Sequence, residues 1–501
     1  MIPSNSPILV GAAQVVQRWD GHGVPDEPLS LMTRAARSAL EDTGCTSISA
    51  IIDRLAVVNI LTWSYADAPG ELAKRLQLSP NDKIYSTVGG NTPQYLVNRA
   101  AEALAAGRCR AVLLAGAETG DALAKARKLD RRFDEWPRRE EPLGLEGDTL
   151  QGVSVEEQTY DLFLPSAMYP LIETAIRARC GRSPSAHRAF LGLLFARFAA
   201  VAAANPYAWF REAHAPERIA TATADNRYVG YPYTKLMNAI IAVDQAAAVV
   251  MTTEAHATAL GIDPSRWVYP MGGADLNDVW HVTERPDLTR SPAIRAAAGH
   301  ALRRAGCQID DITEFDLYSC FPAAVELAMD ALDLAANDPR PLTVTGGLPY
   351  FGGPGNNYSM HAIATAIDRV RANREARVLV SALGWYCTKH AIGIYGAERG
   401  AEAWTPSADR PDQAAIDRTA LAPPLQRAEG PALVDAFVIR HDRDGNPTDG
   451  TVLARLADGS RALAQLDVVA SDLEAIEREE FVGREGCLKH DSAVGLNLFR
   501  P

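Results

Sequence analysis

The sequence predicts an α/β protein built from two similar halves, followed by a small β-rich domain. Short apolar runs alternate with Ala-rich helical stretches, a pattern typical of buried strands covered by helices. The same order of landmarks occurs twice along the chain, and after Trp404 the pattern changes to short strands with Gly-containing turns. We therefore expect a mostly parallel sheet with helices on its faces, and a small antiparallel barrel or sandwich at the end.

The repeat is visible in four pairs of landmarks, each pair about 260 residues apart. Helical runs end at Gly44 and at Gly306, and Gly doublets at 89–90 and 352–353 each precede an Ala-rich helix. Predicted strands follow the same spacing, at 54–59 and 314–319 and at 110–116 and 377–382. Four landmarks in the same order indicate an internal duplication.

These landmarks divide the chain. Residues 1–265 form the first half, with an insertion at about 120–227, and residues 266–405 form the second half. A long insertion in an α/β core usually has a function, and this one, with a predicted helix over 184–204, is expected to cover a cleft. Residues 406–424 lack periodicity and predict a linker, and residues 425–501 predict the β-rich domain.

In that last domain, strands are expected at 433–440, 450–456, 461–464 and 481–487. Residues 442–445 match the first ligand positions of a calcium-binding loop, but the distal Glu of such a loop is missing. A hairpin turn is therefore the better interpretation. We find no phosphate-binding loop, no Gly-x-Ser-x-Gly, no zinc spacing and no dinucleotide fingerprint in the sequence, and we predict no metal site.

Composition limits the function classes. The chain has 501 residues, 47% hydrophobic and 22% charged, which is typical of a soluble globular protein. A net charge of −12 argues against nucleic-acid binding, and no apolar stretch is long enough to predict a membrane span. The start of the sequence shows no signal-peptide pattern, and seven cysteines without metal-ligand spacing indicate reduced thiols. A cytoplasmic location is expected.

Several separated segments resemble thiolases. They are 89–94 (Gly-Gly-Asn-Thr-Pro-Gln), 238–252, 318–321 (Tyr-Ser-Cys-Phe) and 346–354, and the resemblance covers about residues 7–400. With the β-rich tail, the chain is most similar to the thiolase-like proteins of type 1, a sterol-carrier-type group often labelled acetyl-CoA acetyltransferases. The resemblance implies duplicated βαβαβαββ halves in a five-layered α/β sandwich, a C-terminal β-barrel, and acyl-CoA thioesters as ligands.

The resemblance also shows where this sequence departs from thiolases. Gly90 (or Gly89, if the alignment slips by one) stands where thiolases have the Cys nucleophile, and Gly353 stands where they have the activating His. Tyr318 replaces the Asn or His that holds a catalytic water, and Ala382 replaces the second Cys. With all four side chains changed, ordinary Cys-based thiolysis is not expected.

Other reactive groups follow the predicted strands of the second half, at the edge where doubly wound sheets bind ligands. The candidate catalytic residues are Tyr318, Cys320, His361, Cys387, Lys389 and His390. Candidates for binding an oxyanion or substrate are Asn91, Gly352, Gly353, Asn356 and Asn357. Each has a structural alternative: a core Tyr, a buried thiol, a helical His with a local partner, a Lys in an ion pair, or a tight turn.

Three functions remain open at this point. The first is an aldolase-type cleavage of an acyl-CoA that uses Tyr318 or His390 with the turn at 352–357, as the resemblance to thiolase-fold aldolases implies. The second is a catalytically silent protein that binds CoA esters or lipids. The third is acyl transfer through Cys320 or Cys387. No cofactor is expected beyond coenzyme A as part of the substrate, and the chain is expected to be a monomer or a homodimer.

Overall fold

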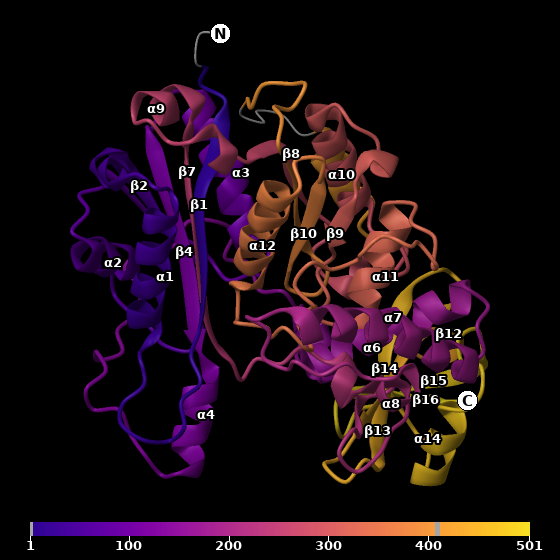
Figure 1. Cartoon of the computed structure of the whole chain (residues 1–501). Coiled ribbons are helices and arrows are strands. Elements are labelled where there is room, and N and C mark those ends of the chain that lie inside the picture. The colour runs from indigo at the N-terminus through magenta and orange to yellow at the C-terminus, as the bar shows by residue number, and fades with distance from the viewer. Residues whose placement is uncertain (1–3, 406–410) are drawn as a thin grey trace.

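Two mixed sheets and a small barrel make up the computed structural model, which describes residues 4–405 and 411–501 (Figure 1). The first sheet has the strand order β1-β7-β4-β2-β3. Its strands are β1 (Pro7–Val16), β2 (Ile52–Val57), β3 (Asp82–Tyr85), β4 (Ala111–Thr119) and β7 (Asp244–Thr253). The helices of this half are α1 (Pro28–Asp42), α2 (Ala68–Leu76), α3 (Thr92–Ala105) and α9 (Glu254–Ala259).

The second sheet has the order β8-β11-β10-β9. Its strands are β8 (Tyr269–Asn277), β9 (Glu314–Asp316), β10 (Val378–Gly384) and β11 (Lys389–Gly396), and its helices are α10 (Pro292–Ala305), α11 (Pro322–Ala331) and α12 (Tyr358–Ala372). The predicted duplication is confirmed, because each half carries its last strand, β7 or β11, between two antiparallel neighbours.

The expectation of a mostly parallel sheet is wrong. The pairs β2–β3, β2–β4 and β9–β10 are parallel, and the other pairs in these two sheets are antiparallel. A strand buried on both faces is an apolar run in either orientation, so the run at 244–253 did not reveal its direction.

Helices α3 and α12 form the central layer between the two sheets. Their apolar side chains, such as Leu96 and Ile363, share one buried cluster with Val112 of β4 and Val380 of β10. Helix α1 covers the outer face of the first sheet and α10 that of the second. The five layers that the resemblance implied are therefore present, and both central helices begin at the edge where the site lies.

The excursion between β4 and β5 contains α4 (Gly120–Lys128), α5 (Val155–Thr159), α6 (Pro165–Arg179), α7 (Pro184–Ala204) and α8 (Pro216–Ala220). A short hairpin of β5 (Tyr228–Gly230) and β6 (Tyr233–Thr234) follows it. In Figure 1 the helices α6 and α7 lie between α11 of the second half and the C-terminal barrel, and α6 contacts both α11 and β12. Glu146, also in the excursion, exchanges two backbone hydrogen bonds with Tyr85 and Thr87, so it covers the end of the edge strand β3.

One helix of the described chain, α7, is long and apolar enough to cross a membrane by length and composition. Its apolar window is 44% buried, and Phe195 and Phe198 lie in the largest core cluster. The helix predicted over 184–204 is confirmed.

The C-terminal domain is a closed barrel with the order β12-β13-β14-β16-β15. Its elements are β12 (Gly430–His441), β13 (Pro447–Leu456), β14 (Arg461–Leu466), α14 (Ala470–Ile476), β15 (Glu485–Asp491) and β16 (Leu496–Arg500). Residues 442–445 form the predicted hairpin turn, closed by a bond from the Gly445 N–H to the Asp442 carbonyl. The β14–β16 pair is parallel, and the other pairs are antiparallel.

Part of the predicted linker is ordered structure. Residues 406–410 lie outside the described residues, and 411–417 form the helix α13 (Pro411–Asp417). Its Gln413 side chain bonds the backbone of Asn277 twice, and Asp412 pairs with His300 at 2.6 Å. Seven residues are too few to show helical periodicity in a sequence, which is why the pattern suggested only a linker.

Candidate functional site

A cavity of about 350 Å³ lies where the two halves meet the excursion. Its walls come from the residues before α3, the start of α6, the segment before β7, the residues before α11, the turn before α12 and the end of β10. They are Val88, Gly89, Gly90, Leu164, Pro165, Ser166, Tyr169, Asn238, Ala239, Ile241, Tyr318, Cys320, Phe321, Leu348, Gly353, Gly355, Asn356, Leu383 and Trp385. In the part of the chain that the structure describes, no Asp, Glu, Lys, Arg or His lines it.

Gly90 and Tyr318 meet in this cavity. A Cβ atom on Gly90 would lie 2.1 Å from the Tyr318 hydroxyl oxygen and 2.6 Å from the Leu383 carbonyl oxygen. The tyrosine hydroxyl therefore fills the space that a side chain at position 90 needs. Burial, with a smaller contribution from Cys320, raises the pKa of Tyr318 well above its usual value. The phenol is neutral at physiological pH and acts as a hydrogen-bond donor.

The loop before α3 is held in place by the second half. The Gly89 N–H donates to Asn356 Oδ1 at 2.9 Å, Asn356 Nδ2 donates to the Asn59 carbonyl at 3.0 Å, and Ser359 Oγ donates to the Gly90 carbonyl. Among the described residues we find no acceptor for the Gly90 N–H, which lies at the N-terminal end of α3 on the cavity wall. Such an N–H can donate a hydrogen bond to a carbonyl oxygen or an oxyanion.

In the predicted binding turn at 352–357, three of the five N–H groups already donate to backbone carbonyls, two of them within the turn. Those of Gly353, Gly355 and Asn357 donate to the carbonyls of Ile240, Gly353 and Pro354. Gly353, Gly355 and Asn356 line the cavity, whereas Gly352 does not.

Two of the predicted binding asparagines lie away from the cavity. The Asn357 side chain is buried against Gly116 of β4, and neither of its amide atoms has a partner within the described structure. Asn91 is buried beside Gly384 and Gly89, and its Oδ1 has no partner there either.

The two candidate thiols are poor nucleophiles where they stand. Cys320 lines the cavity, and burial raises its pKa to about 12. Cys387 is fully buried, and burial raises its pKa further. The thiolate is the reactive form of cysteine, so both residues are almost entirely unreactive thiols near neutral pH.

Lys389 and His390 are neighbours on β11, and their side chains make separate contacts. The Lys389 ammonium donates to the Val88 carbonyl at 2.5 Å beneath Gly89, and burial lowers its pKa to about 8. His390 Nε2 lies 3.1 Å from both Asp278 Oδ2 and the Cys387 carbonyl. Burial alone would raise the pKa of Asp278, but His390 and Arg285 lower it overall. Neither Lys389 nor His390 lines the cavity.

His361 and Ala382 are also enclosed. His361 Nδ1 bonds Gln14 at 2.9 Å, its ring lies against Phe351, and burial lowers its pKa to about 3. Ala382 is buried inside β10, next to Ser381, whose hydroxyl accepts from the Tyr318 N–H. Of the candidate catalytic residues, the structure brings Tyr318 and Cys320 to the cavity.

Several lining residues were not predicted from the sequence. Leu164, Ser166 and Tyr169 come from the excursion, Asn238 and Ile241 from the segment before β7, and Trp385 from the β10–β11 turn. The length of the excursion predicted a cover over a cleft, but no motif indicated which of its residues reach it.

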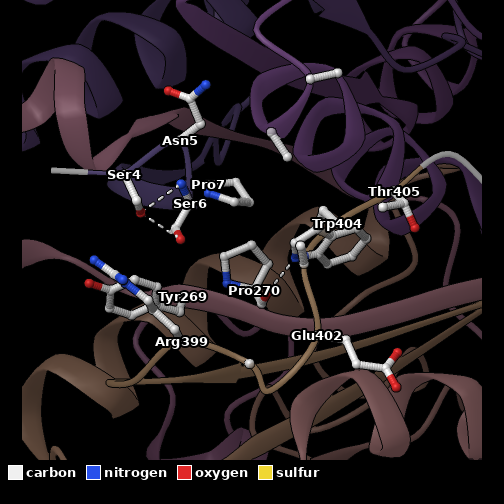
Figure 2. A pocket seen from close by; sticks show the side chains of 14 residues that line it. Ser4, Asn5, Ser6, Pro7, Tyr269, Pro270, Arg399, Glu402, Trp404 and Thr405 are labelled. Atoms are coloured by element: carbon white, nitrogen blue, oxygen red, sulfur yellow. Dashed lines mark hydrogen bonds between the residues drawn. The ribbon is translucent and has the colours of Figure 1, made fainter. Parts of the chain in front are cut away.

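A second cavity of about 550 Å³ lies at the other end of α3 (Figure 2). Ser4 and Tyr269 donate to the carboxylate of Glu254, which also pairs with Arg399, and Trp404 donates to the Pro270 carbonyl. Four side chains of this wall, those of Ser4, Tyr269, Arg399 and Trp404, are thus already bonded within the protein.

The five layers and the cavity at the start of the central helices define a thiolase-fold protein, and comparisons with known proteins agree. A monomeric SCP2-thiolase-like protein type 1 (STLP1) from Mycobacterium smegmatis is 32% identical, with a TM-score of 0.85 over 100% of this chain and 99% of that one. Residues 411–493 match the model of the thiolase-like protein type 1 additional C-terminal domain. The chain belongs to the SCP2-thiolase-like proteins of type 1, as the sequence predicted.

More distant structures share the thiolase fold. An Ltp2-ChsH2(DUF35) aldolase is 18% identical, with a TM-score of 0.59 over 80% of this chain and 100% of that one. An acetyl-CoA acetyltransferase from Syntrophomonas wolfei is 14% identical, with a TM-score of 0.53 over 79% of this chain and 100% of that one. No match was found among curated proteins.

Proposed function

We propose that this protein binds acyl-CoA thioesters in the cavity between its halves without forming a covalent bond to them. The observation that carries the proposal is the contact between Gly90 and Tyr318: the position at the start of α3 has no side chain, and the tyrosine hydroxyl fills its place. A neutral phenol and a free N–H on the same wall are two donors for a thioester carbonyl oxygen.

The other functions that the sequence left open lack a reactive group in the cavity. Acyl transfer needs a thiolate, and the raised pKa values of Cys320 and Cys387 oppose one. An aldol-type cleavage needs a base for the β-hydroxyl group, and no carboxylate, His or Lys of the described chain lines the cavity. Of the two residues considered from the sequence, His390 is bonded to Asp278 outside the lining. Tyr318 does line the cavity, but burial raises its pKa well above the usual value and so opposes the phenolate that a base would need.

We propose that the protein binds its ligand as a monomer. The family member from Mycobacterium smegmatis is described as monomeric. Here Glu146 of the excursion already bonds the end of β3, the strand at the open edge of the first sheet. An edge strand whose backbone groups are partly covered is a poor surface for pairing with a second copy.

Replacing Tyr318 by phenylalanine is expected to weaken acetyl-CoA binding about tenfold, the equivalent of one hydrogen bond to a buried acceptor. Isothermal titration calorimetry with acetyl-CoA measures this loss. Free CoA has no thioester carbonyl, so its affinity is expected to stay unchanged in the same variant.

The matched control is Tyr350→Phe. The Tyr350 hydroxyl is also buried and has no partner in the described structure, but it does not line the cavity. Acetyl-CoA affinity is expected to be unaffected by this change. An absence of acetyl-CoA binding to the wild-type protein, or an equal loss in both variants, would contradict the proposal.

A further inference from the structure

A cluster of buried ionisable side chains connects the wall of the cavity to the second half. Helix α6 lines the cavity with its first residues, and four residues after Tyr169 it presents Glu173 to Glu326 on α11. His187, in the first turn of α7, is the third member. One ligand-type atom from each residue lies within 4.8 Å of the others, and Glu173 and His187 are fully buried.

The hydrogen bonds fix where the protons are. Arg182 Nη1 donates to Glu326 Oε2 at 2.9 Å and lies 3.3 Å from His187 Nδ1. Because arginine can only donate, His187 Nδ1 accepts and the other nitrogen, Nε2, carries the hydrogen. Nε2 lies 2.7 Å from Glu173 Oε1, so the neutral imidazole donates to this carboxylate. The Tyr233 hydroxyl donates to the second oxygen, Glu173 Oε2, at 2.6 Å.

One oxygen is left over. Glu326 Oε1 is buried without a donor within the described structure, and one oxygen of the Glu326 carboxyl group lies within 4.8 Å of one oxygen of the Glu173 carboxyl group. Two ionised carboxylates in this place would repel each other, and within residues 4–405 and 411–501 Arg182 is the one cation bonded to the pair. Nearby Arg177 is bound to Glu480, and Arg179 to Asp330 at the rim of α11. A proton or a metal ion is therefore needed between the two carboxyl groups to offset this repulsion.

The positive species between the two carboxyl groups is a proton rather than a metal ion. A metal needs the lone pair of a histidine nitrogen, but Nδ1 faces the Arg182 guanidinium and Nε2 donates to Glu173. A divalent cation would also lie beside that guanidinium. A carboxylic acid shared between the two glutamates satisfies every group in the cluster.

We propose that Glu173 and Glu326 share one proton, and that this proton is a pH-sensitive latch between α6 and α11 whose loss loosens the α6 wall of the cavity. Helix α6 is also bound to the barrel, through Thr174 and the backbone of Phe437. Opening at the latch therefore changes the wall of the cavity while the barrel contact remains.

The direction of the pH effect follows from burial. Burial, together with the neighbouring Glu173 carboxyl, raises the pKa of Glu326 to about 8 from 4.5, and burial raises that of Glu173. Burial lowers the pKa of His187 to about 4, so His187 stays neutral in the same range. The closed state keeps a proton that the open state releases, so its stability is complete below pH 4.5 and is lost as the pH rises through about 8.

Hydrogen exchange measured by mass spectrometry on the full chain tests the latch. If opening of α6 releases one proton, its opening constant, the equilibrium ratio of open to closed α6, rises tenfold per pH unit between pH 5.5 and 7.5. The exchange rates are corrected for the intrinsic exchange rate at each pH. In Glu326→Gln the amide donates to Glu173 at every pH, so the slope is expected to vanish. Glu480→Gln, which removes the charge paired with the buried Arg177 of the same helix, is the matched control. It is expected to loosen α6 equally at every pH and so to keep the slope.

Alkylation of Cys320 gives a second readout, because this thiol lines the cavity beside Tyr169. From pH 6.5 to pH 8.5, the ratio of the iodoacetamide modification rate of Cys320 in the wild-type protein to that in Glu326→Gln is expected to rise several-fold. The exposed Cys180 and Cys487 are internal standards. A pH-independent opening constant in the wild-type protein would overturn the proposal. One bound equivalent of metal, whose removal by EDTA loosens α6, would also overturn it.

Discussion

Replacing Gly90 by alanine is expected to lower the free energy of unfolding by about 2–3 kcal/mol, as overpacking of a filled interior does. The added Cβ atom would lie 2.1 Å from the Tyr318 hydroxyl oxygen and 2.6 Å from the Leu383 carbonyl oxygen. The second contact is to backbone, which cannot turn away as a side chain can. Urea denaturation measures the loss. Gly144→Ala, where a Cβ atom meets nothing within 4 Å, is the control and is expected to change stability little.

A double-mutant cycle isolates the contact with the tyrosine. Tyr318→Ala alone is expected to lower the free energy of unfolding by about 3–5 kcal/mol, because it leaves a cavity. In the double variant, Gly90→Ala with Tyr318→Ala, the new methyl group of residue 90 occupies part of that cavity. The combined loss is therefore expected to be smaller than the sum of the two by about 1 kcal/mol or more. Additive losses would mean that the two residues do not share the same space.

Replacing Asp278 by alanine is expected to destabilise the protein by about 3–5 kcal/mol, because it leaves a buried group without its charged partner. The Asp278 carboxylate bonds His390 and also accepts from the Ala293 N–H and the Ser291 hydroxyl at the start of α10. Thermal and urea unfolding measure the effect.

Glu474→Ala is the control for that experiment, since Glu474 pairs with Arg478 at the surface and its loss is expected to cost less than about 1 kcal/mol. A folded, stable Asp278→Ala protein that has lost acetyl-CoA binding would give His390 a role at the ligand instead of a role in stability.

The sequence was informative about the fold because its strongest signals are local. The Gly doublets at 89–90 and 352–353 and the apolar runs behind them predicted the duplication, and Asp458-Gly459 predicted a hairpin of the barrel. The direction of β7 could not be predicted, since burial on both faces erases any difference between parallel and antiparallel pairing. The helix α13 is held by its contacts with β8 and α10, which lie far from it in the sequence.

The site was predictable where a motif carried it. The segments with Gly90, Tyr318 and Gly353 meet at one cavity, as their order in the sequence suggested. The adjacent Lys389 and His390 cannot share a face, because side chains alternate along a strand. The lining from the excursion depends on how α6 packs against α11 and β12. That packing includes the pair of Glu173 and Glu326, two residues that are too far apart in the sequence to form a motif.

The central claim, ligand binding without covalent chemistry, is tested most directly by mass spectrometry of both the protein and the CoA thioesters after incubation. One sample contains a 3-ketoacyl-CoA with free CoA, and the other a branched β-hydroxyacyl-CoA alone. We expect both thioesters to be recovered unchanged and the protein mass to be unaltered. Shortened CoA thioesters in either sample, or an acyl adduct on Cys320 or Cys387, would contradict this account.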